Sequence, residues 1–139
     1  RLIHGQVVET WVPHTSADSL IVANDDLAGN PFLRSVMELA VPPSILVRFC
    51  RLDDAIRVLA DADRNGERSI LLVASAADAV TLRKAGAEFD LLNIGNLHFA
   101  AGKVEISPSV FFAPEDFNAL GWLRSPCPAR PGSRRHGRR

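Results

Sequence analysis

Short, nearly continuous aliphatic runs alternate along the chain with segments whose apolar residues recur at helical spacing. The runs predicted to be strands are residues 19–23 (SLIVA), 44–49 (SILVRF), 69–73 (SILLV) and 91–94 (LLNI). They lack the regular polar positions of a strand with one face in water, so we expect both faces of the sheet to be covered.

The segments between these runs predict helices. Helical spacing extends over residues 31–40, 53–62 and 78–85. Asn30 before Pro31 is typical of an N-cap followed by proline at the first helical position, and Gly86 is typical of a helix end. The alternation predicts an α/β fold: an open, mainly parallel β-sheet with helices on both faces, in three α/β/α layers.

Right-handed crossovers bring the carboxyl ends of all parallel strands to one edge of the sheet, where ligands usually bind. Two loops follow predicted strands, and a third, residues 1–6, precedes an apolar helical turn at 7–11 that Pro13 is expected to end. All three share one rim if a strand precedes residue 1, so we expect the chain to be truncated at its N-terminus. The candidate rim residues are Asn24, Asp25, Gly95, Asn96 and His98.

The loop at residues 1–6 has the groups that phosphoryl chemistry needs. His4 is flanked by Gly5 and preceded by Arg1. Neutral imidazole is a nucleophile at physiological pH, since its ordinary pKa is about 6.5. Amides at a helix start and a guanidinium both bind phosphate oxygens. These residues alone leave open whether His4 is instead an incidental polar loop residue.

Size and composition are those of one globular domain. The chain has 139 residues, of which 47% are hydrophobic, and no run approaches the roughly 18 apolar residues of a membrane-spanning helix. The first printed residues do not have the basic and apolar segments of a secretory signal, so none is expected, and neither Cys50 nor Cys127 shows a sequence sign of pairing. We therefore expect a cytoplasmic protein, with Cys50 as a core residue and no cysteine-bound metal.

The net charge of zero conceals two regions of opposite charge. Residues 124–139 contain six arginines and no acid, whereas residues 1–123 contain ten basic and sixteen acidic side chains. The arginine-rich and proline-rich tail has few apolar residues, so we expect a domain over residues 1–123 and a disordered tail over 124–139. No nucleic acid is expected as a partner, although the basic tail keeps that alternative open.

Several separated motifs resemble one family. The segment RLIHGQV followed by TWV at residues 10–12 closely resembles the signature of IIB subunits of sugar phosphotransferase systems of the mannose/fructose/sorbose class. IVAND at 21–25, AVPP at 40–43 and LNIGNLH at 92–98 resemble further family elements, in the same order. Motifs that recur in order over residues 1–120 are more specific than one histidine loop.

The resemblance implies a phosphocarrier. His4 falls on the family's phosphorylated histidine, which accepts a phosphoryl group from a phosphohistidine of the IIA domain. The group then passes to a hexose held by the membrane IIC/IID subunits. In this scheme Arg1 and the backbone amides of Gly5, Gln6 and Val7 bind the phosphoryl oxygens, and neither a metal nor a cofactor is required. The sugar and a homodimeric state stay open.

Three departures from the family pattern bear on activity. Two acidic residues that usually precede the arginine lie outside this sequence, and Asn96 stands where the family has glycine, although asparagine tolerates positive φ better than most residues. The family's last apolar strand is absent, which would expose a sheet edge. A non-catalytic module of the same fold and a nucleic-acid-associated protein are therefore kept as alternatives.

Overall fold

The structure is a computed structural model. It describes residues 2, 3, 5, 7–89, 91–94, 104–107, 110–112, 118, 119, 121 and 123.

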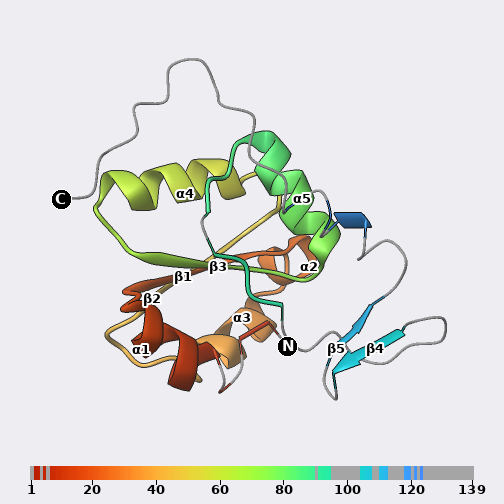
Figure 1. The fold of residues 1–139 in the computed structure, drawn as a ribbon. Coiled ribbons are helices and arrows are strands. Elements are labelled where there is room, and N and C mark those ends of the chain that lie inside the picture. Colours follow the sequence, from red (N-terminus) through yellow and green to blue (C-terminus); the bar gives the residue numbers. More distant parts are fainter. Residues whose placement is uncertain are drawn as a thin grey trace.

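Three parallel strands of five residues form the central sheet (Figure 1). They are β1 (Ser19–Ala23), β2 (Leu46–Cys50) and β3 (Ser69–Val73), in the order β2-β1-β3. The strands lie in simple register, with Ser19 opposite Leu46 on one side and Ser69 on the other. The central strand, β1, therefore ends level with both neighbours, and the loops that follow the strands start at one edge.

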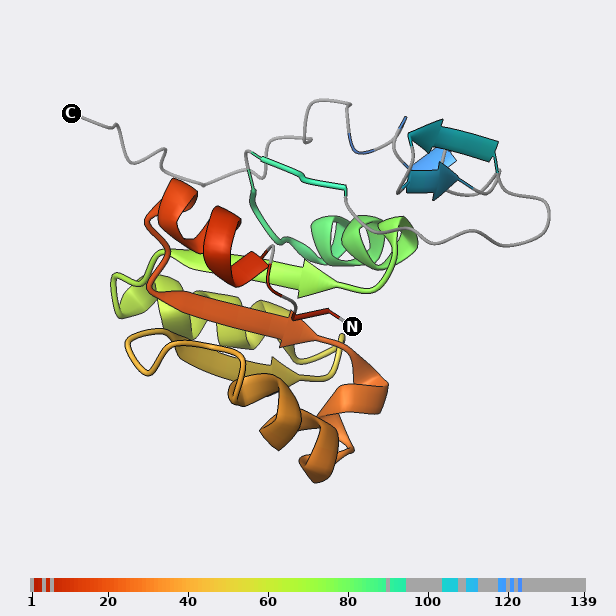
Figure 2. The same cartoon turned by 90° about the horizontal axis from the view of Figure 1, so that it is seen from below.

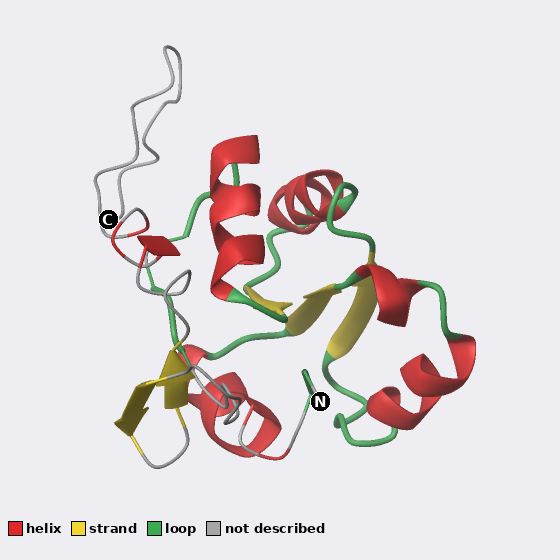
Figure 3. Cartoon of the chain, turned by 90° about the vertical axis from the view of Figure 1, so that its right-hand side faces the viewer, coloured by secondary structure: helices red, strands yellow, loops and turns green. Residues whose placement is uncertain are grey.

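Helices cover both faces of this sheet, as Figure 2 and Figure 3 show from two sides. On one face lie α4 (Ala55–Arg64) and α5 (Ala76–Ala85). On the other lie η1 (Val7–Trp11), a π-helical turn, then α1 (Val12–Thr15) and α3 (Pro31–Glu38). The short α2 (Asp25–Ala28) lies at the carboxyl end of β1. The three-layer α/β/α prediction is confirmed.

The side chains of β1 alternate between two separate cores. Ile21 and Ala23 pack in one cluster with residues of α4 and α5, including Ala55 and Leu82. Val22 packs on the opposite face of the sheet, with Ile3 and Leu27. Strand geometry sends successive side chains to opposite faces, so a continuous apolar run supplies both cores.

Most predicted boundaries are close to the observed ones. The strands at 19–23 and 69–73 are confirmed, and the one expected at 44–49 forms as β2, shifted toward its carboxyl end. The Asn30 side chain accepts a hydrogen bond from the Leu33 N–H at 3.1 Å, and Gly86 ends α5 with φ of 111°. Both cap predictions are confirmed.

Two local predictions are wrong. Residues 91–94 form no strand: Leu91 is 65% exposed and Leu92 38% exposed, and the segment has no ladder partner among the described strands. A short apolar run becomes a strand only where a sheet edge is within hydrogen-bonding reach. Pro13 does not end the first helical turn either. It lies in the first turn of α1, where its missing N–H has no helical partner to lose, and Ser16, with φ of 53°, ends that helix.

A hairpin near the C-terminal end was not predicted. β4 (Val104–Ser107) and β5 (Val110–Phe112) pair antiparallel with an irregular register. Each strand is too short to stand out as an alternating run. The predicted tail, residues 124–139, lies outside the described residues, as does Cys127.

Candidate functional site

Asn24 occupies the carboxyl end of the central strand. Its side chain accepts a hydrogen bond from the Leu27 N–H at 3.0 Å and so caps α2, while its own N–H donates to the Cys50 carbonyl at 3.0 Å. The second bond continues the β1–β2 ladder beyond both strands. Asn24 is therefore fixed at the rim predicted from the sequence.

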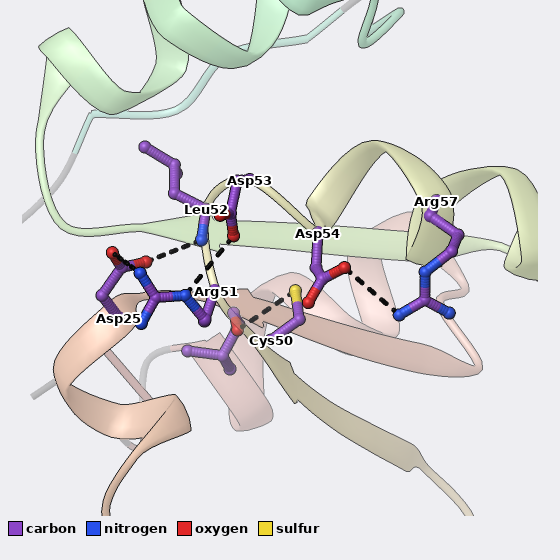
Figure 4. Close-up of polar contacts among 8 residues, drawn as sticks. Asp25, Cys50, Arg51, Leu52, Asp53, Asp54 and Arg57 are labelled. Carbon is purple, nitrogen blue, oxygen red and sulfur yellow. Dashed lines mark hydrogen bonds and ion pairs between the residues drawn. The ribbon is translucent and has the colours of Figure 1, made fainter.

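Asp25 ties this rim to the loop that follows β2 (Figure 4). One carboxylate oxygen accepts a hydrogen bond from the Leu52 N–H at 2.8 Å, and the other accepts one from Arg51 at 3.2 Å. Arg51 also lies 3.5 Å from the Asp53 carboxylate. The side chains of Asp25 and Arg51 are 51% and 57% exposed, so this is a solvent-accessible polar cluster beside the strand ends.

The first loop is anchored to the same edge by its apolar residues. Ile3 is only 3% exposed and packs with Val22 and Leu27, which lie two positions before and two positions after the Asn24–Asp25 turn. Val7 is buried in a neighbouring cluster with Val12 and Leu20. The described part of the loop is therefore held by packing against the end of β1.

Gly5 is exposed, and a Cβ there would lie 3.9 Å from the nearest carboxyl atom of Glu9, an ordinary contact distance. Crowding by described atoms is therefore no reason for glycine at this position. Small size next to the histidine remains the property that suits close approach of a ligand to the backbone.

The other predicted site residues lie outside the described residues. They are Arg1, His4, Gln6, Gly95, Asn96 and His98. Of the ten predicted site residues, the structure therefore brings together Asn24 and Asp25 at the carboxyl end of β1. Val7 packs instead near Leu20, toward the start of that strand, and Gly5 is exposed in the first loop.

Sequence analysis missed Arg51 and the Leu52 amide. The sequence contains a signal for both groups. Arg51 directly follows β2, and a residue that follows a parallel strand lies at the carboxyl edge of the sheet, here beside the turn after β1. A strand that ends at Cys50, one residue beyond the predicted end, is what places Arg51 at the rim.

Cys50 is a core residue, as expected. It is 7% exposed, packs in the cluster beneath α4, and lies 3.8 Å from the Val22 carbonyl. Burial raises the pKa of its thiol, with Asp54 adding to the shift. A neutral, buried thiol is a poor nucleophile, so the rim chemistry does not involve Cys50.

The described part of the chain contains no cluster of three metal-ligating side chains and no helix long and apolar enough to cross a membrane. The groups that the described rim presents are the Asp25 carboxylate, the Arg51 guanidinium and the Asn24 side-chain amide.

Comparison with known proteins decides the family. Residues 1–127 match the family model described as "PTS system sorbose subfamily IIB component". The chain belongs to this family. Among similar proteins, the N-acetylgalactosamine-specific phosphotransferase enzyme IIB component 2 of Escherichia coli is 36% identical over 126 residues, which cover 90% of this chain and 79% of that protein.

Solved structures agree with this assignment to the IIB family. The IIB domain of the sorbose permease from Klebsiella pneumoniae is 30% identical, with a TM-score of 0.79 over 88% of this chain and 76% of that one. An N-acetylgalactosamine IIB component from Streptococcus pyogenes is 31% identical, with a TM-score of 0.81 over 88% of this chain and 75% of that one. The protein is thus a IIB phosphotransferase, a phosphocarrier in sugar uptake that works with IIA and IIC/IID partners.

Proposed function

We propose that His4 is the residue that carries the phosphoryl group. The observation that best supports this is the burial of Ile3 against Val22 and Leu27, which anchors the RLIHGQV loop at the carboxyl edge of the sheet. That edge is where parallel α/β sheets place ligands, and it holds the Asn24–Asp25 turn and Arg51. His4 directly follows Ile3 in the sequence, so the anchor at Ile3 supports a role for His4 in the chemistry of this rim.

In the proposed reaction a IIA phosphohistidine is the donor. A neutral nitrogen of His4 uses its lone pair to form a P–N bond as the donor's P–N bond breaks, and the donor imidazole leaves with that electron pair. In the second step a hexose hydroxyl oxygen forms a bond to the same phosphorus as the P–N bond to His4 breaks. The imidazole leaves with that electron pair, and the hydroxyl proton passes to the imidazole. Arg1 and the amides of Gly5, Gln6 and Val7 would stabilise charge on the phosphoryl oxygens in both steps.

Asp25 has a positioning role in this proposal. Both of its carboxylate oxygens hold the loop after β2, through Arg51 and Leu52. An aspartate committed to those contacts fixes the shape of the rim on which the donor lands. Gly95, Asn96 and His98 stay proposed rim residues on the strength of the LNIGNLH motif.

The partners follow from the family and its fused relatives. The mannose-specific EIIAB component of Escherichia coli is 29% identical over 90% of this chain, which spans 39% of that longer protein. Its name joins IIA and IIB, which supports a IIA phosphohistidine as the donor. We place the protein in the cytoplasm beside the membrane IIC/IID subunits that hold the hexose, and leave the sugar and the homodimer open.

The central experiment is phosphorylation by a phosphorylated IIA domain, followed by mass spectrometry of the intact chain and of its peptides. The wild type should gain one phosphoryl group on the peptide that contains His4. His4→Ala should gain none, whereas His14→Ala, which removes an exposed histidine outside the loop, should react as the wild type does. Phosphate on another residue, or none on a folded wild type, would refute the proposal and favour the non-catalytic module.

Two substitutions of Asp25 separate positioning from direct chemistry. Asp25→Asn keeps an acceptor for the Leu52 N–H but loses the ion pair with Arg51, whereas Asp25→Ala loses both. We expect amide exchange at Leu52 to be faster in Asp25→Ala than in Asp25→Asn, and His4 phosphorylation to be slower than in wild type but present in both. Complete loss of phosphorylation in Asp25→Asn, with Leu52 still protected, would instead indicate direct contact with the reacting groups.

The nucleic-acid alternative has a separate test. Deleting residues 124–139 removes six arginines. Electrostatic DNA binding would fall on deletion and weaken with salt, and phosphorylation of His4 should be unchanged.

A further inference from the structure

The outward side of α3 carries a row of exposed apolar side chains. Phe32 is 74% exposed, Val36 is 46% exposed, and Leu39, which directly follows the helix, is 87% exposed. These residues are four and three positions apart, so they lie on one face of the helix. Met37 packs instead with Ile3 in the core. The helix is therefore held on the sheet by its other side, and the row stays open to solvent.

The row is a concentration of apolar surface rather than a scatter. Among the described residues, seven large apolar side chains are exposed, and four of them are Phe32, Leu33, Val36 and Leu39. Single exposed apolar residues are normal on a protein surface, whereas a contiguous group is typical of an interaction site. The outward side of α3 therefore has the composition of a docking surface.

This surface begins at the rim of the sheet. Only residues 29 and 30 separate α3 from α2, and the Asn30 N–H donates to the Leu27 carbonyl at 3.1 Å, which turns the chain from one helix into the next. Figure 2 shows α3 beside α2 at the carboxyl end of β1. Phe32 lies in the first turn of α3, so it is the end of the apolar row that is next to the rim.

The described rim beside α2 carries more negative than positive charge. Its charged side chains are those of Asp25, Asp26, Asp53, Asp54, Arg51 and Arg57. Both arginines pair with aspartates of this set, whereas the exposed Asp26 forms no ion pair among the described residues. A partner that contacts both the rim and α3 therefore needs apolar groups next to cations.

We infer that the α2–α3 face, made of Asp26, Phe32, Val36 and Leu39, docks on the cytoplasmic surface of the membrane IIC/IID subunits. Short cytoplasmic loops of membrane proteins carry an excess of lysine and arginine, and aromatic residues are enriched where such proteins leave the membrane. That surface offers both the cations and the apolar groups that the face needs. Phe32 is the anchor, since aromatic side chains dominate the binding energy of interfaces.

Charge disfavours other occupants of this face. A second copy related by a two-fold axis would bring the same acidic side chains together. The cytoplasmic leaflet is itself negatively charged, so bare lipid repels Asp26. A IIA donor brings a negatively charged phosphoryl group, which gains nothing from an acidic neighbour.

This inference rests on the membrane partners of the proposed function, but not on which residue carries the phosphoryl group. Its test therefore measures binding of the unphosphorylated chain to vesicles of phosphatidylethanolamine and phosphatidylglycerol, with and without the protein's own IIC and IID subunits. Phe32→Ser removes the anchor, and Phe32→Leu is its matched control. Asp26→Lys reverses the free charge, and Asp63→Lys makes the same change at an exposed position on α4. Circular dichroism checks that each variant is folded.

Phe32→Ser should weaken binding to the vesicles that contain IIC and IID by about tenfold or more, and Phe32→Leu should bind nearly as the wild type does. Asp26→Lys should weaken binding severalfold and reduce its dependence on salt, whereas Asp63→Lys should change neither. Equal binding by wild type and Phe32→Ser, or no binding by the wild type, would overturn the inference.

Three further outcomes would also overturn it, each by assigning the face to another occupant. Equal binding to vesicles without IIC and IID would assign it to lipid. A KM for phosphorylated IIA that rises in Phe32→Ser, with vesicle binding unchanged, would assign it to the donor. Self-association of the wild type that is lost in Phe32→Ser, measured by sedimentation at two concentrations, would assign it to a second copy. None of these results bears on phosphorylation of His4, which is measured with IIA and without membranes.

Discussion

β1 and β3 are two strands of the same length and nearly the same apolar character, in very different surroundings. Each has five residues, and they pair directly, with a hydrogen bond of 2.6 Å between the hydroxyls of Ser19 and Ser69 at their first residues. All five residues of β1 have 0% exposure, whereas all five of β3 are half-buried. The difference comes from neighbours: β1 lies between two strands, whereas β3 pairs on one side only within the described sheet and its residues line a cavity of about 510 Å³.

This contrast separates what a strand's sequence contributes from what its position contributes. Hydrophobic stabilisation depends on the apolar area removed from water, so similar side chains in β1 and β3 should differ in their effect on stability. Local contacts such as helix caps should not differ in this way, because they depend on residues a few positions apart.

The largest expected effect is at Ile21, which lies opposite Leu71 in the register. Ile21→Ala should lower the free energy of unfolding by about 2–5 kcal/mol, since it removes a fully buried side chain from the core beneath α4 and α5. Leu71→Ala should cost about half as much or less, because Leu71 borders the cavity. Urea titrations followed by circular dichroism measure both, and equal losses would show that the edge position has no effect on stability.

An intermediate effect is expected at the helix caps that follow the two strands. Asn24 caps α2 after β1, and Ser75 caps α5 after β3 by accepting the Asp78 N–H at 3.1 Å. Asn24→Ala and Ser75→Ala should each cost about 1 kcal/mol, and the control Asn24→Ser, which keeps an acceptor, should cost much less. A marked difference between the two alanine variants would mean that the caps depend on the burial of the preceding strand.

The smallest expected effect concerns an ion pair that links the outer strands. Arg48 of β2 binds Glu67, just before β3, through two hydrogen bonds of 2.5 and 2.6 Å. The hydrogen bonds from Arg48 lower the pKa of Glu67 to about 2, and hydrogen bonds from Asn65 and Ser19 also lower it. The pKa of Glu67 in the folded protein lies below its ordinary value near 4.3. The ion pair therefore stabilises the protein fully at pH values above about 4.3, and this stabilisation is lost as the pH falls toward 2.

Glu67→Gln should therefore lower the thermal midpoint at pH 7 by a few degrees at most and flatten its fall between pH 5 and pH 2. Glu38→Gln, which removes an exposed carboxylate on α3, is the matched control and should leave that fall unchanged. The same acid dependence in Glu67→Gln and wild type would show that the fork does not link the strands energetically.

The sequence by itself determined the elements and the side of the sheet on which the site lies. Continuous apolar runs predicted β1, β2 and β3, and Asn30 and Gly86 predicted helix ends, because strand burial, N-caps and left-handed helix stops depend on nearby residues. The rim positions of Asn24 and Asp25 followed from the rule that parallel strands end at one edge.

Tertiary structure alone decided which apolar runs are paired and which polar groups meet. Residues 91–94 have the pattern of a strand but no ladder partner in the described sheet, and Arg51 reaches Asp25 across 26 positions of sequence. Pairing and long-range ion pairs depend on distances between segments that the order of residues does not contain. The sequence therefore specified the layers and the rim, and only the packing of strands against one another decided that β1, and not β3, has a strand on each side within the described sheet.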